Sequence, residues 1–208
     1  MTNPPPSENP ENTVFIVDDD AGMRKGMDFL VSSAGYRCVS FASAEEFLEF
    51  LRPEMRGCLL LDVRMPGMGG LELQQELAAR KLQLPVIIVT AFANVPMAVR
   101  AIQAGAFDFV EKPFEGSELL EHVRRALASE RREWRDAEQL REIRERIASL
   151  TPREREVMDL VVAGRLNKEI AAELGISIKT VENHRACVMQ KTRADSLATL
   201  VRMSLAAE

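Results

Sequence analysis

Short apolar runs, each ending on a polar residue, alternate with segments of helical periodicity from Thr13 to about Ser129. This alternation is typical of a parallel sheet covered on both faces, because strands buried on both sides read as near-continuous apolar runs. The predicted strands span residues 13–18, 37–41, 57–62, 84–90 and 107–112. Five such units predict a doubly wound α/β domain of (βα)5 type with a five-stranded parallel sheet.

Polar side chains end four of the predicted strands. In chain order they are Asp18, Asp62, Thr90 and Lys112. Ligands of doubly wound sheets sit at the carboxyl ends of the strands. We therefore expect these four side chains to converge on one edge of the sheet.

The acidic residues at this edge predict a site for a metal and a phosphate. Three aspartates, residues 18–20, follow the first strand, and Asp62 ends another. Clustered carboxylates repel one another and favour a hard cation such as Mg²⁺, which takes one or two carboxylates, a backbone carbonyl, waters and a substrate phosphate. A carboxylate can be the nucleophile of phosphoryl transfer when cations neutralise the transferred oxygens. Lys112 can be one such cation, and Thr90 can offer a hydroxyl.

The last part of the chain predicts short helices only. The segment TPRE at 151–154 offers an N-cap Thr, a Pro at the first helical position and a Glu at the third. Asn167 and Ser177 can cap the next two helices. Residues 167–190 read as two helices joined by a tight turn at 174–176. Residues 150–208 are therefore predicted to form an all-α helix-turn-helix domain.

The second helix of this motif offers a polar face that suits a DNA groove. Lys179, Thr180 and Lys191 are expected to hold phosphates, and Asn183, His184 and Arg185 to reach base edges. For any one of these residues the alternative is a solvated helix face without a ligand. A metal at His184 is not expected, because no partner stands at ligand spacing.

Residues 115–150 contain no proline and no glycine after Gly116, and their apolar residues recur at spacings of three and four. This pattern predicts one long helix, of which residues 127–149 form a helical linker. Alternating charges along 130–146 favour a solvated face. The alternative is a coiled-coil-like linker whose apolar seam pairs with a second chain, although the seam slips near Leu140. The apolar positions are Leu119, Leu120, Val123, Leu127, Trp134, Leu140, Ile143, Ile147 and Leu150.

Charge restricts where a nucleic acid could bind. The chain has a net charge of −5, to which residues 1–126 contribute −6, residues 127–150 zero and residues 151–208 +1. A DNA-binding surface must therefore be a local stripe in the last third of the chain.

Two further features concern the setting of the protein. Residues 1–12 lack the apolar core of a signal peptide and predict a disordered tail. No apolar run approaches the roughly 18 residues of a membrane span, so a cytoplasmic protein without membrane contact is expected. Cys38, Cys58 and Cys187 lack metal-ligand spacing and are expected to be buried small hydrophobes rather than redox sensors.

Four segments resemble the receiver domain of two-component response regulators. They are VDDD, LLLDVRMPGMGGLEL, PVIIVTA and GAFDFVEKPF. The resemblance covers residues 13–126 and implies a flavodoxin-like fold. It implies that Asp62 accepts a phosphoryl group, and that Asp18, Asp19, Asp62 and the backbone carbonyl of Arg64 bind Mg²⁺.

The same resemblance assigns the residues that would respond to phosphorylation. It implies that Thr90 and Phe109 form the switch and that Lys112 contacts the phosphate. It also implies a cis peptide bond between Lys112 and Pro113, which aims the lysine inward.

Residues 150–203 resemble the four-helix effector domain of the LuxR/FixJ class, and the domain order resembles that of FixJ-like response regulators. The resemblance implies that a sensor histidine kinase phosphorylates Asp62 and that this switches dimerisation and sequence-specific binding to double-stranded DNA. Phosphorylation would either release the DNA-binding domain or create a dimer face, and the sequence does not choose between the two. It implies control of transcription, with RNA polymerase as a partner and activation as the expected direction. The last helix, at about 195–206, is expected to form the homodimer contact through Leu197, Leu200 and Val201.

Two other functions share part of this sequence pattern. Phosphatases resembling haloacid dehalogenases also use an Asp nucleophile with Mg²⁺, but they need a second Asp two residues later as the general acid. That position is Arg64, which cannot donate a proton at neutral pH. A dedicated enzyme is therefore not expected. The second alternative is a binding module whose receiver dimerises without control by phosphorylation.

One position departs from the nearest relatives of this type. They often read TGHGDVPMAV where this chain has TAFANVPMAV, so Phe92 stands two residues after Thr90. A phenylalanine there should exclude water rather than orient it. We expect slow hydrolysis of phosphorylated Asp62; a longer phosphate lifetime in Phe92→His would contradict this.

Overall fold

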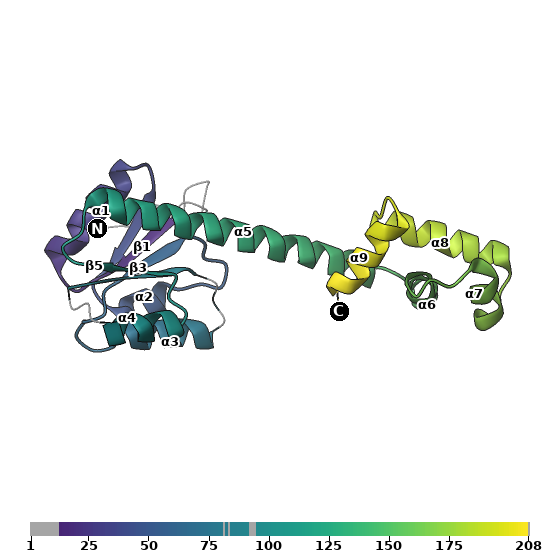
Figure 1. Cartoon of the computed structure of the whole chain (residues 1–208), viewed down its shortest axis with the longest axis horizontal. Helices are drawn as coiled ribbons and strands as arrows, with labels where there is room; N and C mark the ends of the chain where they lie inside the picture. The colour runs from purple at the N-terminus through teal and green to yellow at the C-terminus, as the bar shows by residue number, and fades with distance from the viewer. Residues whose placement is uncertain (1–12, 81, 83, 92–94, 208) are drawn as a thin grey trace. The chain divides into compact units, whose positions relative to one another are not determined.

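The computed structural model of the protein describes residues 13–80, 82, 84–91 and 95–207. The predicted tail at 1–12 and Phe92 lie outside the described residues, so the expectations for them stay predictions. The chain divides into two compact units, Met1–Glu133 and Trp134–Glu208 (Figure 1).

The first unit contains the predicted five-stranded parallel sheet, whose strands are joined in the order β2-β1-β3-β4-β5. Each observed strand falls within its predicted range, which confirms the doubly wound fold. The strands are β1 (Thr13–Val17), β2 (Arg37–Phe41), β3 (Cys58–Leu61), β4 (Val86–Thr90) and β5 (Asp108–Glu111). All pairings are parallel, so the carboxyl ends of all five strands lie at the same edge.

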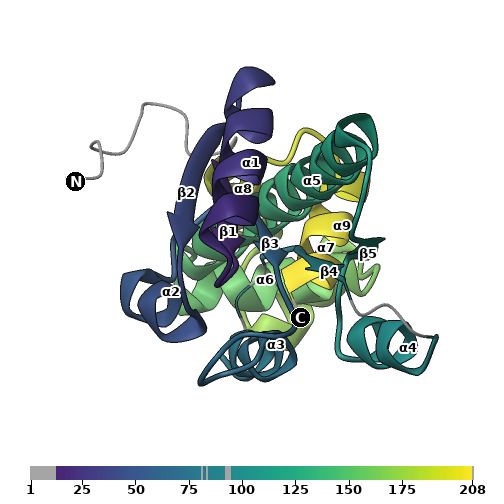
Figure 2. The same ribbon diagram turned by 90° about the vertical axis from the view of Figure 1, so that its left-hand side faces the viewer.

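Helices cover both faces of this sheet, as Figures 1 and 2 show. On one face lie α1 (Ala21–Ser33) and the beginning of α5 (Gly116–Ala148); on the other lie α2 (Ala44–Phe50), α3 (Gly70–Ala79) and α4 (Val95–Gln103). Apolar side chains fill two separate cores, one on each side. Ser43 caps the start of α2, since its Oγ accepts from Glu46 N–H, and Glu46 Oε2 accepts from the N–H of Ala42, the residue before the cap.

The predicted long helix is present as α5, which has 33 residues. Its first turns, as far as Leu127, belong to the core of the first unit. Farther along, the buried Glu130 forms an ion pair with Arg56, whose Nε lies 2.8 Å from Glu130 Oε1. Its last turns, with Ile143 and Ile147, pack in the core of the second unit. Both ends of the predicted 127–149 linker thus carry core side chains.

The second unit consists of the end of α5 and four helices. They are α6 (Pro152–Val162), α7 (Asn167–Leu174), α8 (Ile178–Thr192) and α9 (Leu197–Ala207). Thr151 and Ser177 cap α6 and α8 as predicted, and Gly175 ends α7 with a left-handed φ of 65°. The prediction that Asn167 caps α7 is wrong. Leu166 holds the cap position, and Asn167 Oδ1 instead accepts a hydrogen bond from Arg185 Nη1 at 2.6 Å.

The cysteines differ in burial. Burial raises the pKa of the Cys58 thiol and of the half-buried Cys38 thiol far above the usual value, so both are held as neutral thiols. Cys187 is exposed on α8, which contradicts the prediction that all three are buried. Among the described helices, none combines the length and the apolar character that crossing a bilayer requires.

Two helical glycines allow a matched test of the packing around Asp62. A Cβ on Gly70, the first residue of α3, would lie 2.1 Å from the carbonyl oxygen of Asp62, whereas a Cβ on Gly26 in α1 would meet nothing within 4 Å. Gly70→Ala should therefore destabilise the protein by about 1–3 kcal/mol through overpacking. Gly26→Ala should stabilise it by about 1 kcal/mol through helix propensity. Urea unfolding measures both, and equal effects of one sign would contradict this packing.

Candidate functional site

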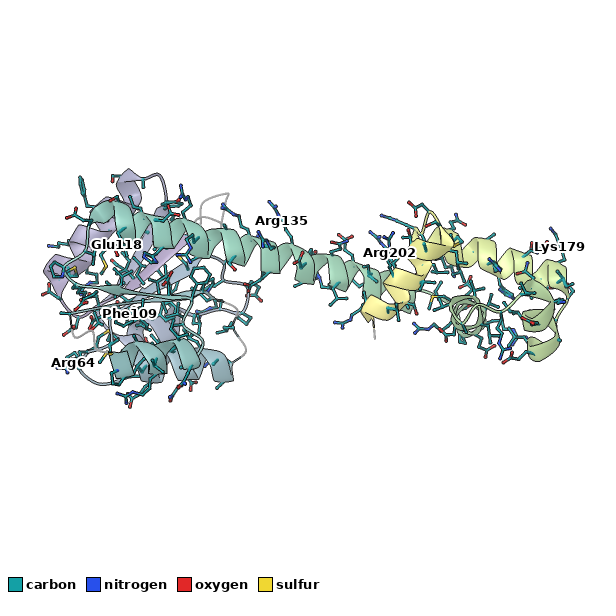
Figure 3. The ribbon with its side chains drawn as sticks, viewed as in Figure 1. Arg64, Phe109, Glu118, Arg135, Lys179 and Arg202 are labelled. Atoms are coloured by element: carbon teal, nitrogen blue, oxygen red, sulfur yellow. The ribbon has the colours of Figure 1, made fainter. Side chains whose placement is uncertain are left out.

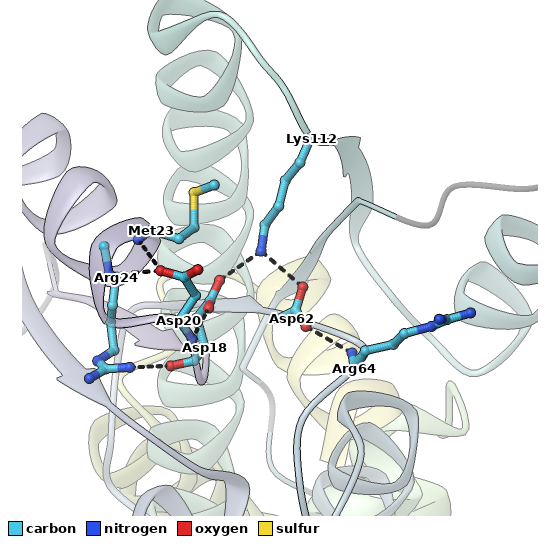
Figure 4. A network of polar contacts seen from close by, with 8 residues as sticks. Asp18, Asp20, Met23, Arg24, Asp62, Arg64 and Lys112 are labelled. Atoms are coloured by element: carbon cyan, nitrogen blue, oxygen red, sulfur yellow. Dashed lines mark hydrogen bonds and ion pairs between the residues drawn. The ribbon is translucent and has the colours of Figure 1, made fainter.

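The carboxyl edge of the sheet brings together the side chains expected there. Lys112 Nζ lies 2.7 Å from Asp18 Oδ2 and 2.9 Å from Asp62 Oδ1, so one ammonium group bridges two carboxylates (Figure 4). Backbone pairing between adjacent strands sets this geometry, because Asp62 N–H donates to Val17 O at 2.9 Å and Lys112 N–H donates to Thr90 O at 2.9 Å. The Lys112–Pro113 peptide is cis, as expected.

The three consecutive aspartates have separate positions. Asp18 is buried, and its Oδ1 accepts from Asp20 N–H at 2.8 Å. Asp20 caps α1 by accepting from the N–H groups of Gly22 and Met23, and these bonds lower its pKa. Asp19 is exposed. All three aspartates line the pocket, and Asp20 is in addition tied to the start of α1.

Arg24 was not identified from the sequence, although it belongs to this network. Its Nη1 donates to the carbonyl oxygen of Asp18 at 2.6 Å (Figure 4). Its place one turn into α1 was the available signal, because α1 begins directly at the pocket.

Burial and pairing oppose each other at Asp62. Desolvation raises the pKa of its carboxyl group, while the hydrogen bonds from Lys112 and from the Arg64 N–H favour the ionised form. For Lys112 burial lowers the pKa, but bonds to Asp18 and Asp62 outweigh burial and raise it. Lys112 therefore stays a cation, and it keeps two desolvated carboxylates from facing each other unpaired.

The pocket that these residues line is open and has a volume of about 490 Å³. Its lining also includes Met23, Ala91 and Pro113. Within the described parts of the chain, no three acidic, His or Cys side chains converge as a complete metal cage. This donor set fits Mg²⁺, which needs only one or two carboxylates and completes its shell with carbonyl, water and phosphate oxygens.

Of the other three predicted residues, Arg64 lines the pocket, whereas Thr90 and Phe109 are not among its lining residues. Thr90 ends β4 and is fully buried. Phe109 lies in β5 and is half-buried against the core on the α2, α3 and α4 side. Arg64 N–H donates to Asp62 Oδ2 at 2.8 Å, and its side chain projects away from the domain (Figures 3 and 4).

The exposed face of α8 differs from the predicted one. Val181 and Val188 fill the core, while Lys179 and Asn183 are exposed, and Figure 3 shows Lys179 pointing outward. His184 and Arg185 are half-buried on the flanks of the helix, so they offer less surface than Lys179 and Asn183, and their role as base readers stays a prediction. The exposed positions that the sequence reasoning missed are Glu182, Ala186, Cys187 and Gln190.

Two residues expected to hold phosphates are engaged within the domain. Thr180 Oγ1 lies 2.8 Å from Ser177 Oγ in the cap of α8. Lys191 Nζ donates to Glu154 Oε2 at 2.6 Å, and this bond, with that from the Thr151 N–H, lowers the pKa of Glu154 to about 2. Lys179, paired only loosely with Glu182 at 3.4 Å, is the best placed of the predicted cations.

The predicted dimer residues on α9 are not equivalent. Leu200 is 1% exposed and belongs to the core of its own unit, so its side chain is not available to a second chain. Leu197 is 47% exposed, and Val201 is half-buried. The prediction that Leu200 forms part of the dimer contact is therefore wrong.

Both units match known families. Residues 14–124 match the response regulator receiver domain, and residues 148–204 match the bacterial regulatory proteins of the luxR family.

Relatives match nearly the whole chain. The transcriptional regulatory protein FixJ of Rhizobium meliloti is 45% identical over 194 residues, which cover 93% of this chain and 95% of that protein. Nodulation protein W of Bradyrhizobium diazoefficiens is 44% identical over 92% of this chain and 84% of that protein. The structure of the response regulator StyR matches with a TM-score of 0.87 at 44% identity, covering 93% and 98% of the two chains. The full-length structure of FixJ from B. japonicum matches with a TM-score of 0.58 at 41% identity, covering 94% and 97%. The chain therefore belongs to the FixJ-like two-component response regulators, which control transcription in a phosphorylation-dependent manner.

Proposed function

We propose that Asp62 is the phosphoryl acceptor of this regulator and that a sensor histidine kinase supplies the phosphoryl group. The observation that supports this proposal best is the position of the Lys112 ammonium group, whose Nζ lies 2.9 Å from Asp62 Oδ1 and 2.7 Å from Asp18 Oδ2. This cation lies beside the carboxylate that would react. It can stay paired with Asp18 while it turns toward a phosphoryl oxygen.

In the proposed step a carboxylate oxygen of Asp62 forms a bond to phosphorus while the bond from phosphorus to the donor's imidazole nitrogen breaks. The leaving imidazole keeps the electron pair of that bond and takes up a proton. Burial, which raises the pKa of Asp62, makes its ionised oxygen more basic and hence a stronger nucleophile. Lys112 holds the carboxylate ionised before transfer and neutralises charge on the transferred group.

We propose that Asp18, Asp19, Asp62 and the backbone carbonyl of Arg64 hold Mg²⁺. When bound, this ion supplies charge neutralisation and alignment for the phosphoryl oxygens. Asp18 and Asp62 are buried, and Asp19 is exposed at the rim of the pocket.

We propose that the switch runs through Thr90 and Phe109. A phosphoryl group on Asp62 offers oxygens to which the Thr90 hydroxyl can donate. Movement of Thr90 would alter the packing of half-buried Phe109 in the neighbouring strand β5. A pre-existing equilibrium of the α4 and β5 surface would then shift toward the form that favours dimerisation.

Labelling with acetyl phosphate tests the acceptor. Wild-type protein with Mg²⁺ should gain the mass of one phosphoryl group, and chelation of the divalent cation should abolish the gain. Asp62→Asn should gain nothing, because an amide is no nucleophile for this transfer. Asp28→Asn, an aspartate of α1 outside the pocket lining, should label like wild type. Equal labelling of Asp62→Asn would contradict the proposal.

We propose that α8 reads DNA through Lys179 and Asn183. Lys179 is exposed at the start of the helix, where recognition helices meet the groove, and Asn183 lies one turn later on the same face. Leu197 and Val201 on α9 are proposed to contact a second copy of the chain. The resulting dimer would bind two half-sites on DNA and activate transcription by recruiting RNA polymerase.

This surface can be tested on a duplex that the phosphorylated protein selects from random sequences. The quantity measured is the affinity of each variant for that duplex. Lys179→Ala should weaken binding to all sequences alike and reduce the salt slope by about 1. Asn183→Ala should cost about 1–3 kcal/mol on the selected duplex and relax the preference at one base. Arg155→Ala, an exposed cation of α6, serves as the matched control. A footprint of a single half-site would contradict the dimer, and loss of binding in the control would contradict the assignment to α8.

A further inference from the structure

A carboxylate from α2 lies against the loop that follows the acceptor strand. This loop, residues 62–69, joins β3 to α3 and is called the acceptor loop below. Met68 N–H donates to Glu45 Oε1 at 2.8 Å, a contact between residues 23 positions apart. Glu45 thus ties the acceptor loop to a different element of the domain.

The approach of Glu45 to the loop backbone is close. Gly67 has a left-handed φ of 75°, and a Cβ at that position would lie 2.7 Å from Glu45 Oε1. The absence of a side chain at Gly67 is therefore what lets the carboxylate reach the adjacent N–H group. The same bond lowers the pKa of Glu45, so the charged form makes the contact at neutral pH.

Several other contacts join the C-terminal half of the loop to α3 and to the core. Gly69 N–H donates to Glu72 Oε2 at 2.9 Å, and Gly70 N–H donates to Val63 O at 3.0 Å. Met65 and Met68 pack against the core. These contacts shape the loop, whereas Glu45 holds its far side to α2.

The beginning of the same loop carries the reacting groups. Asp62 is its first residue, and Arg64 N–H donates to Asp62 Oδ2 at 2.8 Å. A shift of the main chain at Gly67 and Met68 would be transmitted over a few residues to this carboxylate and to the Arg64 carbonyl. Misplacement of a reacting group by about 1 Å can cost about 10²-fold in rate.

We infer that Glu45 is a positioning residue for phosphoryl transfer, whose carboxylate holds the acceptor loop at Met68 and so maintains the geometry of Asp62 and Arg64. The inference rests on the proposed role of Asp62. Because Glu45 is exposed and makes one hydrogen bond to the loop main chain, it contributes little to global stability. Glu45 instead opposes local opening of the loop.

Two measurements on the full chain test the inference. Hydrogen exchange by mass spectrometry, on metal-free protein, should show faster exchange of the peptide covering residues 62–70 in Glu45→Ala. The second measurement is the rate of labelling by acetyl phosphate over a range of Mg²⁺ concentrations. Glu45→Ala should need about tenfold more Mg²⁺ to reach half of its maximal rate. Tenfold is the low end of the loss of metal affinity that follows removal of a residue supporting the metal ligands. Glu45→Gln should restore most of both properties, because its amide oxygen can still accept from Met68 N–H.

Glu49→Ala, another exposed glutamate of α2, is the matched control and should behave like wild type. Unchanged exchange in Glu45→Ala, or wild-type labelling at every Mg²⁺ concentration, would overturn the inference. Equal defects in Glu45→Ala and Glu45→Gln would also overturn it, since they would mean that charge rather than the hydrogen bond matters. If wild type itself is not labelled, the proposed function of Asp62 fails, while the exchange data still decide whether Glu45 holds the loop.

Discussion

Asp18 and Asp62 end adjacent strands, β1 and β3, and both are buried, so their carboxylates would repel each other without a shared cation. Lys112 supplies that cation from the end of β5, two strands away from β3 in the sheet. The bridge therefore requires the register of β1, β3, β4 and β5. A change of charge at Asp62 would alter what Lys112 is bonded to, and under the proposed function this is how the fold responds to phosphorylation.

The pocket could be predicted from the sequence because it depends on one regular feature. Parallel strands place their carboxyl ends at a common edge, so residues that end apolar runs must meet there. Asp18, Asp62, Thr90 and Lys112 were identified by this argument, and the described strands bear it out. The predicted caps at Thr151 and Ser177 were equally local, since each depends on residues within three positions.

Predictions based on residue type alone were less successful. His184 and Arg185 were selected as polar residues on α8, but Val181 and Val188 set the phase of the helix and turn both to its flanks. Leu200 is apolar like Leu197, yet it faces the core of its own unit. Contacts such as Glu45 with Met68 and Arg56 with Glu130, 74 positions apart, depend on loop paths that no periodicity encodes.

We propose that chemistry at Asp62 controls the DNA-binding unit of the same chain. The most direct test of this control is the affinity of the full-length protein for its selected duplex, measured at one fixed salt concentration before and after treatment with acetyl phosphate and Mg²⁺. We predict tighter binding after treatment of the wild type and no change for Asp62→Asn. Equal affinities of the treated and untreated wild type, with phosphorylation verified by mass, would contradict the claim.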